Sequence, residues 1–251
     1  MRKYSFLDHG EALLTVMVQG DTPTHVEGLI ERALPAGAEA FGMQFCVMKP
    51  EYRTKEAYRR LFEQAQRPVY VTNYRGKENA GKSDEQLAEE LLELAECGAT
   101  LCDVMGDCFA PCKGEVIDDP VAIKKQEELI RKLHEKGAEV VISSHILQYT
   151  PPERVLEIAL EYQRRGADVC KLVTGAETME EQLENLKTVD LLRRNLKIPF
   201  LFLSSGENRL LRRLGGTLGC CMYLAVLEYD QFATKVQPLL ADLVQLRGLL
   251  K

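Results

Sequence analysis

Short apolar runs recur along the chain and alternate with longer segments of helical periodicity. Runs this short and this uniformly apolar are typical of strands buried on both faces of a sheet. Eight of them occur, at residues 13–18, 40–47, 68–73, 101–105, 138–144, 168–174, 198–204 and 216–224. The pattern predicts eight strands, with helical segments between them.

The segments between the runs carry recognisable helix boundaries. Ser or Thr stands three residues before Glu or Gln in SDEQ, TPPE and TMEE, which predicts capping boxes at Ser83, Thr150 and Thr178. Pro151 fits the first helical position, where the missing N–H of proline is tolerated. Glycines that follow helical runs predict helix C-caps at Gly37, Gly98, Gly137 and Gly166.

These alternations predict an α/β fold, a (β/α)8 TIM barrel in which residues 1–251 form a single domain. The connections are short, and no Pro/Gly/Ser-rich linker divides the chain. The alternative is an open, doubly wound sheet. That fold would carry a G-x-G-x-x-G signature after an early strand, whereas VQGDTPTH follows the first one. The barrel is therefore favoured.

The net charge, the N-terminal sequence and the longest apolar stretch limit the kinds of partner to be expected. The net charge is −6 with both signs interspersed, which argues against nucleic acid, because a nucleic-acid binder needs a basic footprint. The start MRKYSFLDHGEALLTVMV lacks the apolar run of a signal peptide, and the stretch LGCCMYLAVL is too short to span a bilayer. We expect a cytoplasmic protein with a small-molecule ligand and no membrane partner.

The cysteines do not indicate a disulfide framework. Several of the eight lie in strand-like runs, where cysteine behaves as a small hydrophobic residue, and we expect them to be reduced. Cys108 and Cys112 form the one spaced pair in a loop. A single C-x3-C pair is weak evidence for zinc, and two free thiols are the simpler interpretation.

Polar side chains interrupt or close several strands of the predicted barrel. They are Gln44, Arg75, Ser143, Ser144, His145, Lys171, Ser204 and Ser205. In a TIM barrel the carboxyl ends of all strands meet at one face, and active sites form there. These residues therefore predict a site at that face.

Lys171 stands inside the apolar run of GADVCKLVTG. Alternation puts Val169, Lys171 and Val173 on one face of the strand, and an inward-facing lysine would lie in the pocket. Burial lowers the pKa of a lysine and yields the neutral amine that carbonyl chemistry needs. The alternative is a structural lysine that reaches the rim or pairs with Asp103 or Asp168.

His145 closes the strand that precedes the strand of Lys171. Neighbouring strands lie about 4.8 Å apart, so the two side chains can approach each other across the barrel mouth. We interpret His145 as a general acid/base, with a structural histidine at a strand end as the alternative. The three other histidines lie in a terminal segment or on helical faces, and no set of metal ligands emerges.

Two segments closely resemble the type I 3-dehydroquinate dehydratases. They are EVVISSHILQYTPPERVLEIALEYQRRGADVCKLVTGAET and RLGGTLGCC, and the similarity extends over most of the chain. That family consists of (β/α)8 barrels of the shikimate pathway, which serves aromatic amino acid biosynthesis, and it works through a lysine Schiff base. The resemblance implies that His145 in SSH and Lys171 in GADVCK are the catalytic pair, that no cofactor is needed, and that the protein is a homodimer.

The resemblance also implies roles for residues outside the catalytic pair. Arg213 in RRLGG falls on the carboxylate-binding arginine of the family, and Gln237 falls near the glutamine of its lid. Arg75 resembles the substrate-binding arginine after the third strand. The carboxylate that orients the histidine falls on Glu78, or in another register on Asn79.

The second and fourth strands depart from the family pattern. The family's E-x-R-x-D is replaced by Gly42, Gln44 and Cys46, and Met105 stands where D-[LIV]-E has its glutamate. Gln44 remains a candidate substrate-binding residue. Each hydrogen bond lost to a substrate hydroxyl costs about 1–3 kcal/mol. We therefore expect an altered substrate preference.

The resemblance, together with Lys171 and His145, implies a lyase that forms a Schiff base and eliminates water from a cyclic hydroxy-keto carboxylate, 3-dehydroquinate or a related compound. One alternative is a class I aldolase-type enzyme, which would break a C–C bond and release a small carbonyl fragment. The other is a non-catalytic carboxylate-binding relative. Lys171 and His145 argue against the second alternative, because a binding module needs neither a buried amine nor an imidazole beside it.

Overall fold

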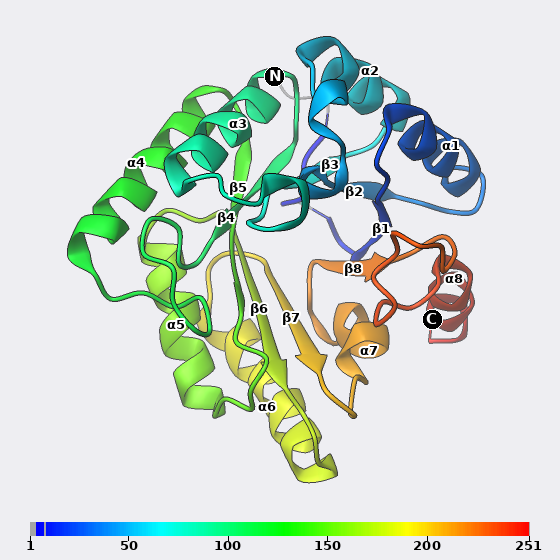
Figure 1. The fold of residues 1–251 in the computed structure, drawn as a ribbon. Coiled ribbons are helices and arrows are strands. Elements are labelled where there is room, and N and C mark those ends of the chain that lie inside the picture. The colour runs from blue at the N-terminus through cyan, green and yellow to red at the C-terminus, as the bar shows by residue number, and fades with distance from the viewer. Residues whose placement is uncertain (1–3, 8, 251) are drawn as a thin grey trace.

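Strands and helices alternate along the whole of the computed structural model, which describes residues 4–7 and 9–250 (Figure 1). The strands are β1 (Leu13–Val18), β2 (Ala40–Gln44), β3 (Val69–Thr72), β4 (Leu101–Met105), β5 (Glu139–His145), β6 (Val169–Gly175), β7 (Phe200–Ser205) and β8 (Met222–Ala225). The helices are α1 (Pro23–Ala33), α2 (Lys55–Ala65), α3 (Asp84–Glu96), α4 (Pro120–Glu135), α5 (Pro152–Arg164), α6 (Met179–Asn195), α7 (Leu211–Leu218) and α8 (Leu240–Leu249).

The strands form one parallel sheet in the order β7-β6-β5-β4-β3-β2-β1-β8. Its two edges approach each other where the backbone N–H of Cys221 donates to the carbonyl of Phe200 at 2.9 Å. The sheet is therefore a nearly closed barrel surrounded by helices, and the predicted (β/α)8 fold is confirmed. The register of β5 with β6 places Ser143 beside Lys171 and His145 beside Val173.

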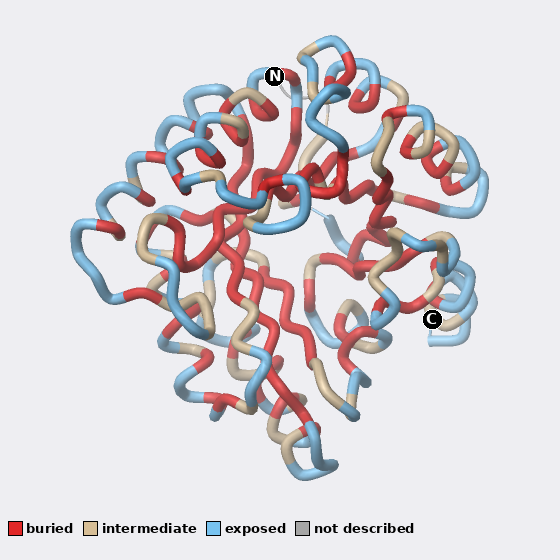
Figure 2. Tube along the Cα trace, viewed as in Figure 1, coloured by how far each residue is buried: buried red, intermediate tan, exposed pale blue. Residues whose placement is uncertain are grey.

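The strands are buried on both faces, as their uniformly apolar sequences predict (Figure 2). Their side chains pack against the barrel interior on one side and against the apolar faces of the helices on the other. α3 and α6 begin at the predicted capping boxes of Ser83 and Thr178. The glycines at 37, 98, 137 and 166 all have positive φ, as C-caps require.

Several local predictions are wrong. The run at 40–47 is a strand only as far as Gln44, and Phe45–Val47 form a short 3-10 helix. The helix after Thr150 has no capping box, because Pro151 is the N-cap residue and the Thr150 hydroxyl donates to the carbonyl of Gln148 at 3.2 Å. The run at 216–224 is not one strand. Residues 216–218 complete α7, Gly219 turns the chain with a φ of 127°, and β8 begins only at Met222.

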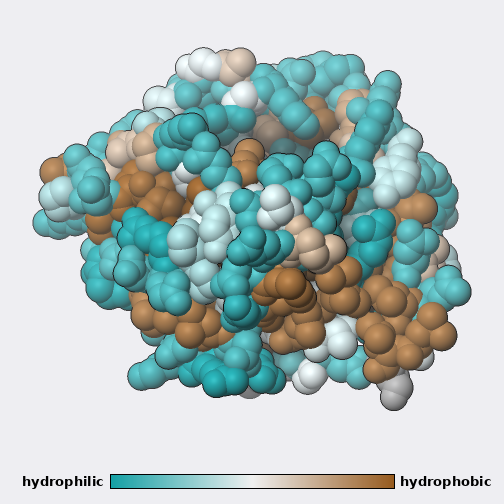
Figure 3. Space-filling view, turned by 90° about the horizontal axis from the view of Figure 1, so that it is seen from below, coloured by the Kyte–Doolittle hydropathy of each residue, from teal (hydrophilic) through white to brown (hydrophobic). Residues whose placement is uncertain are grey.

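Viewed from below, the molecule carries a broad patch of apolar side chains among polar ones (Figure 3). β6 and β7 point towards this side in Figure 1, and exposed apolar residues near their ends include Met179, Leu183 and Leu210.

All eight cysteine thiols are free. Among the helices that the structure describes, none combines the length and apolar character needed to cross a bilayer.

Candidate active site

A cavity of about 190 Å³ opens at the carboxyl ends of the strands. We call it the inner cavity. Seven of the eight strands or the segments that follow them, together with the β8–α8 loop (residues 226–239), supply its walls. The walls include Met17, Gln19, Gln44, Tyr70, Tyr74, His145, Lys171, Arg212, Thr234, Val236 and Gln237.

Lys171 lies in the middle of β6 with only 5% of its surface exposed. Its Nζ donates to the hydroxyls of Tyr74 at 2.9 Å and Tyr70 at 3.1 Å, and lies 3.5 Å from Oδ2 of Asp103. Burial lowers the pKa of Lys171, although the charges of Asp103 and Glu115 oppose the shift. The ammonium is thus partly destabilised in a position that faces the inner cavity.

Asp103 on β4 organises the groups around that lysine. Its Oδ2 accepts hydrogen bonds from Tyr70 and, at 2.5 Å, from Tyr74, while its Oδ1 accepts one from Ser143 at 2.5 Å. Burial and the charge of Asp103 raise the pKa of both tyrosines well above the ordinary value, so their hydroxyls remain protonated donors. Every oxygen of this buried carboxylate is satisfied, as a charge in the interior requires.

His145 ends β5 and is held by Glu115 from the loop between β4 and α4. One carboxylate oxygen of Glu115 accepts the backbone N–H of His145 at 2.8 Å and contacts ring Nδ1 at 2.9 Å. Burial opposes ionisation of Glu115, but the hydrogen bonds and charge of His145 prevail and lower the pKa of Glu115. With Nδ1 bonded to a carboxylate, Nε2 is the nitrogen free to exchange protons in the inner cavity. The ring also meets Tyr74 edge to face, with centroids 5.6 Å apart.

Glu115 has a backbone conformation that non-glycine residues rarely adopt, with φ at 55°. Its carbonyl is fixed by the hydroxyls of Ser144 at 2.5 Å and Tyr162 at 3.2 Å. A Cβ at Gly106 would collide with all three of these groups, so only glycine permits the approach. Such strain persists where surrounding contacts over-determine the backbone, and it is common at functional sites.

Two polar residues face the cavity near the end of β7 and in the β8–α8 loop. Arg212 is 8% exposed, donates from Nε to the carbonyl of Ser204 at 2.9 Å, and has no carboxylate partner in the described chain. Burial and the charge of Arg209 lower the pKa of Arg212 to about 10. Gln237 is buried, and its Oε1 has no hydrogen-bond partner among the described residues. Both side chains thus have free capacity for a ligand.

Hydrogen bonds tie the β8–α8 loop to the first two strands. The Oε1 of Gln19 accepts the backbone N–H of Thr234 at 3.1 Å and its hydroxyl at 3.3 Å. Gln19 in turn donates to Gln44, which donates to the sulfur of Cys46 at 3.3 Å. Gln44 therefore lies at the cavity, as predicted, and through Gln19 it also helps to hold the β8–α8 loop in place.

Two residues with predicted site roles point elsewhere. Arg75 forms a two-bond ion pair with Asp84, at 2.7 and 2.6 Å, and another bond to Asp107 at 2.7 Å, and it is not part of the cavity wall. Glu78 is exposed on the short helix η3 (Lys77–Asn79), and the carboxylate beside His145 is Glu115. Asn79, the other candidate, bonds to the carbonyl of Tyr74 at 2.8 Å.

Of two neighbouring arginines, the one with the predicted carboxylate-binding role, Arg213, does not line the inner cavity. Arg213 is exposed and faces away from the inner cavity, while Arg212 lines it. The reason is the rotation of α7, whose buried face carries Leu211, Arg212 and Gly215. The sequence contains a signal for this, because a small residue three positions after Arg212 marks the face that packs closely.

Other site residues were missed in the sequence. Tyr70 and Tyr74 follow the period of a strand, i and i+4, with Thr72 between them on the same face, and all three line the cavity. Glu115 lies in an irregular loop, where periodicity carries no information. Met105 and Cys46, two of the departures from the family pattern, are buried outside the cavity wall. No group of three or more His, Cys, Asp or Glu side chains in the described chain is arranged to hold a metal.

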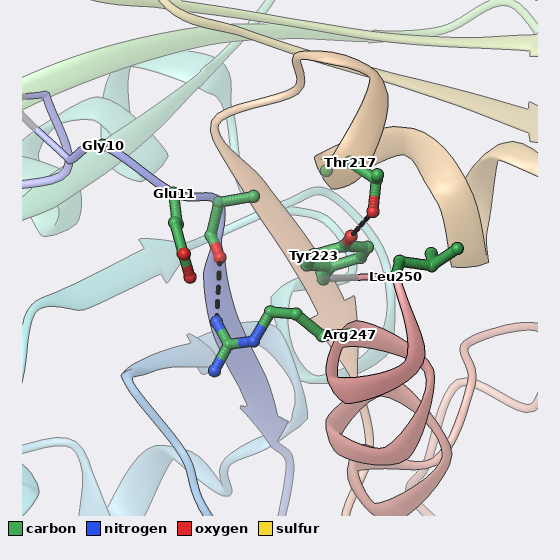
Figure 4. A pocket seen from close by; sticks show the side chains of 8 residues that line it. Gly10, Glu11, Thr217, Tyr223, Arg247 and Leu250 are labelled. Carbon is green, nitrogen blue, oxygen red and sulfur yellow. Dashed lines mark hydrogen bonds between the residues drawn. The ribbon is translucent and has the colours of Figure 1, made fainter.

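A second cavity of about 200 Å³ lies at the opposite end of the barrel (Figure 4). Arg247 on its wall reaches the carbonyl of Ala12, and Thr217 bonds to Tyr223. The guanidinium of Arg247 is already paired with Glu39 through two bonds of 2.7 and 2.6 Å. These groups stabilise the base of the barrel, where residues usually serve stability.

A barrel with a buried lysine, a carboxylate-held histidine and a free arginine around one cavity at its carboxyl face is typical of enzymes that act on small molecules. A family model described as type I 3-dehydroquinase matches residues 14–251. The chain belongs to this family.

Individual relatives share little sequence identity with the chain or match only part of it. A 3-dehydroquinate dehydratase of Alkaliphilus oremlandii is 31% identical over 94 residues, and the match spans only 37% of each chain. The structure of the Geobacillus kaustophilus 3-dehydroquinate dehydratase superimposes with a TM-score of 0.82 at 17% identity, over 97% of this chain and 93% of the other. The structure of the Clostridium difficile type I 3-dehydroquinate dehydratase, solved with covalently modified comenic acid, superimposes with a TM-score of 0.81 at 16% identity. The superposition covers 100% of this chain and 98% of the other.

Proposed function

We propose that the protein is a Schiff-base lyase that removes water from a cyclic hydroxy-keto carboxylate, 3-dehydroquinate or a close relative. The observation that carries the proposal is Lys171. It is a buried amine with a lowered pKa, it faces the cavity, and a histidine and an unpaired arginine share that cavity. A carbonyl, an acidic C–H bond and a carboxylate on one small substrate match these three groups.

The amine of Lys171 attacks the ketone carbon to form a carbinolamine, and loss of water leaves a protonated imine. The imine acidifies the neighbouring C–H bond, and Nε2 of His145 takes that proton. The electron pair expels the β-hydroxyl, which leaves as water with the proton returned by His145. Attack of water on the imine then releases the enone and restores Lys171.

The surrounding residues hold the reacting groups. Tyr70 and Tyr74 position Nζ of Lys171 through hydrogen bonds, and their own orientation is set by Asp103. Glu115 orients the imidazole and stabilises the imidazolium that forms when His145 accepts a proton. Arg212 and the free Oε1 of Gln237 receive the substrate carboxylate and an adjacent hydroxyl, respectively.

The part of the wall around Met17 on β1 favours a substrate without a hydroxyl at that point. A Cβ at Gly42 would collide with the sulfur of Met17, so the thioether occupies the space that a side chain at position 42 would need. Met17 lines the cavity and offers no strong donor or acceptor to a ring hydroxyl.

Borohydride trapping tests the proposal. Incubation with 3-dehydroquinate, and with cyclic keto-carboxylates that carry fewer hydroxyls, should leave a reduced adduct on the peptide that contains Lys171. Mass spectrometry locates the adduct, and the ultraviolet absorbance of the enone follows turnover. Adducts on other lysines only, or turnover without an adduct, contradict the Schiff base. Release of a small aldehyde or ketone would instead identify an aldolase.

A further inference from the structure

We propose that another cavity, at the same barrel face as the inner cavity, is an anion subsite for a phosphate or similar oxyanion. The anion is either a second anionic group of the substrate or a free anion. We call this cavity the outer cavity. Its volume is about 490 Å³, and its walls include Arg209, Arg213, Lys235, Gln182 and Glu207. The proposal that this anion belongs to the substrate rests on the proposed function of the inner cavity.

The two cavities are neighbours separated by the β8–α8 loop. Val236 and Gln237 line both of them, so a ligand held at the inner cavity can extend past this loop. The hydroxyl of Tyr229, which also lines the outer cavity, donates to the carbonyl of Gln237 at 2.9 Å and fixes the shared wall.

Among the described residues, no carboxylate pairs with the cations of the outer cavity. Arg209, Arg213 and Lys235 form no ion pair with any described residue, whereas several exposed arginines elsewhere do, such as Arg131 with Glu128 at 2.7 Å and Arg32 with Glu228 at 2.7 Å. Glu207 supplies one carboxylate to the wall against three cations. In a protein with a net charge of −6, unpaired positive charge gathered at one mouth is a local electrostatic feature that attracts an anion.

A buried amide adds a second, independent observation. Gln182 at the start of α6 is 1% exposed and lines the outer cavity. Its Oε1 accepts the backbone N–H of Leu210 at 3.1 Å, but its Nε2 has no partner among the described residues. A buried N–H donor without an acceptor is costly, and an oxyanion bound there would satisfy it.

The place in the fold agrees with this chemistry. The outer cavity is built from the loops that follow β7 and β8 and from the start of α7, which has no side-chain cap. In TIM barrels, phosphate groups frequently bind between the loops after strands 7 and 8 and the N-terminus of a short extra helix, and here the start of α7 lies beside these loops in place of that extra helix. Arg209 also lowers the pKa of Arg212 by its charge, so an anion in the outer cavity would relieve repulsion between the two guanidinium groups.

Calorimetric titration with inorganic phosphate tests the subsite directly. The double variant Arg213→Gln/Lys235→Gln should bind phosphate at least tenfold more weakly than the wild type. The matched control Lys125→Gln/Arg131→Gln removes two cations from α4, and should bind phosphate like the wild type. Equal weakening in both double variants would reduce the effect to overall charge and overturn the proposal.

Two single variants separate this site from the inner cavity. Arg212→Gln and Lys171→Met should retain phosphate binding, and loss of binding in either would place the anion in the inner cavity and overturn the proposal. Because Lys171→Met cannot form an imine, retained phosphate binding there keeps the subsite independent of the Schiff-base mechanism. If borohydride leaves no adduct on Lys171 but phosphate still binds, only the Schiff-base mechanism is refuted.

Kinetics distinguish the two sources of the anion. For paired keto-carboxylates with and without a phosphate ester, the Arg213→Gln/Lys235→Gln variant should raise KM at least tenfold only for the phosphorylated one. Inorganic phosphate should then compete only with that substrate. Phosphate that binds without competing with either substrate would support the subsite and assign it to a free anion.

Discussion

A single carboxylate oxygen of Glu115 accepts the backbone N–H of His145 at 2.8 Å and meets its ring Nδ1 at 2.9 Å. The two contacts fix the ring position and the tautomer together, although the residues are 30 positions apart, Glu115 in the β4–α4 loop and His145 at the end of β5. The carboxylate that orients the proposed general base therefore comes from the β4–α4 loop, not from the segment after β3.

Glu115→Gln should lower kcat by about 10- to 100-fold, part of the contribution that a positioned acid/base makes. The reason is that an amide can present its N–H to Nδ1 and favour the wrong tautomer. Borohydride trapping on Lys171 should persist, because the imine does not need that tautomer. Glu78→Gln is the matched control and should be indistinguishable from wild type in both measurements. A larger loss in Glu78→Gln than in Glu115→Gln would reverse the assignment.

Arg75→Gln should lower kcat while leaving KM nearly unchanged, because Arg75 acts on the β4–α4 loop and not on the substrate. Its partners Asp84 and Asp107 accept the backbone N–H groups of Phe109 at 2.7 Å and Cys112 at 2.9 Å, in the loop that carries Glu115. Amide hydrogen exchange at Phe109 and Cys112 should accelerate. The role that sequence similarity implies, direct substrate binding, predicts the opposite pattern: a raised KM and unchanged exchange.

Lys171→Met should change the pH dependence of the free energy of unfolding. Burial lowers the pKa of Lys171 in the folded state below its ordinary value of 10.5, so between the two values the unfolded chain binds more protons. Wild-type stability therefore rises with pH in that window as the penalty for the buried charge disappears. The variant lacks this rise, and its relative advantage should be greatest below the folded pKa and fade towards pH 10.5.

Urea denaturation at several pH values between neutral and alkaline measures this difference. Parallel stability curves for the wild type and Lys171→Met would show that Lys171 has the same pKa in both states. That result would remove the physical basis for a neutral amine at this position.

Gly42→Ala should destabilise the protein by about 1–3 kcal/mol, the usual cost of overpacking, because the new Cβ would collide with Met17. Adding Met17→Ala should restore part of the loss, with a coupling of about 0.5–3 kcal/mol in the double-mutant cycle. Gly28→Ala on α1 is the control, since a Cβ there meets nothing within 4 Å, and it should be neutral or stabilising. Strict additivity of the two changes would contradict the packing of Met17 on Gly42.

The pattern of apolar and polar residues along the chain was enough to predict the barrel fold and to single out Lys171 and His145. Strands buried on both faces read as uniform apolar runs, and capping residues and C-cap glycines mark helix ends, because these preferences act within a few residues. Lys171 was recognisable because a lysine is rare in such a run, and its strand neighbour His145 because parallel strands end at a common face.

Only the tertiary structure decided which side chains join that pair. Arg212 was distinguished from Arg213 by the rotation of α7 against the sheet, which depends on packing with β7 and β8. Glu115 was distinguished from Glu78 by the path of a loop held through Arg75, Ser144 and Tyr162, residues remote in sequence. Local sequence preferences act over neighbouring residues, whereas these choices arise from contacts between distant segments that exist only once the barrel has formed.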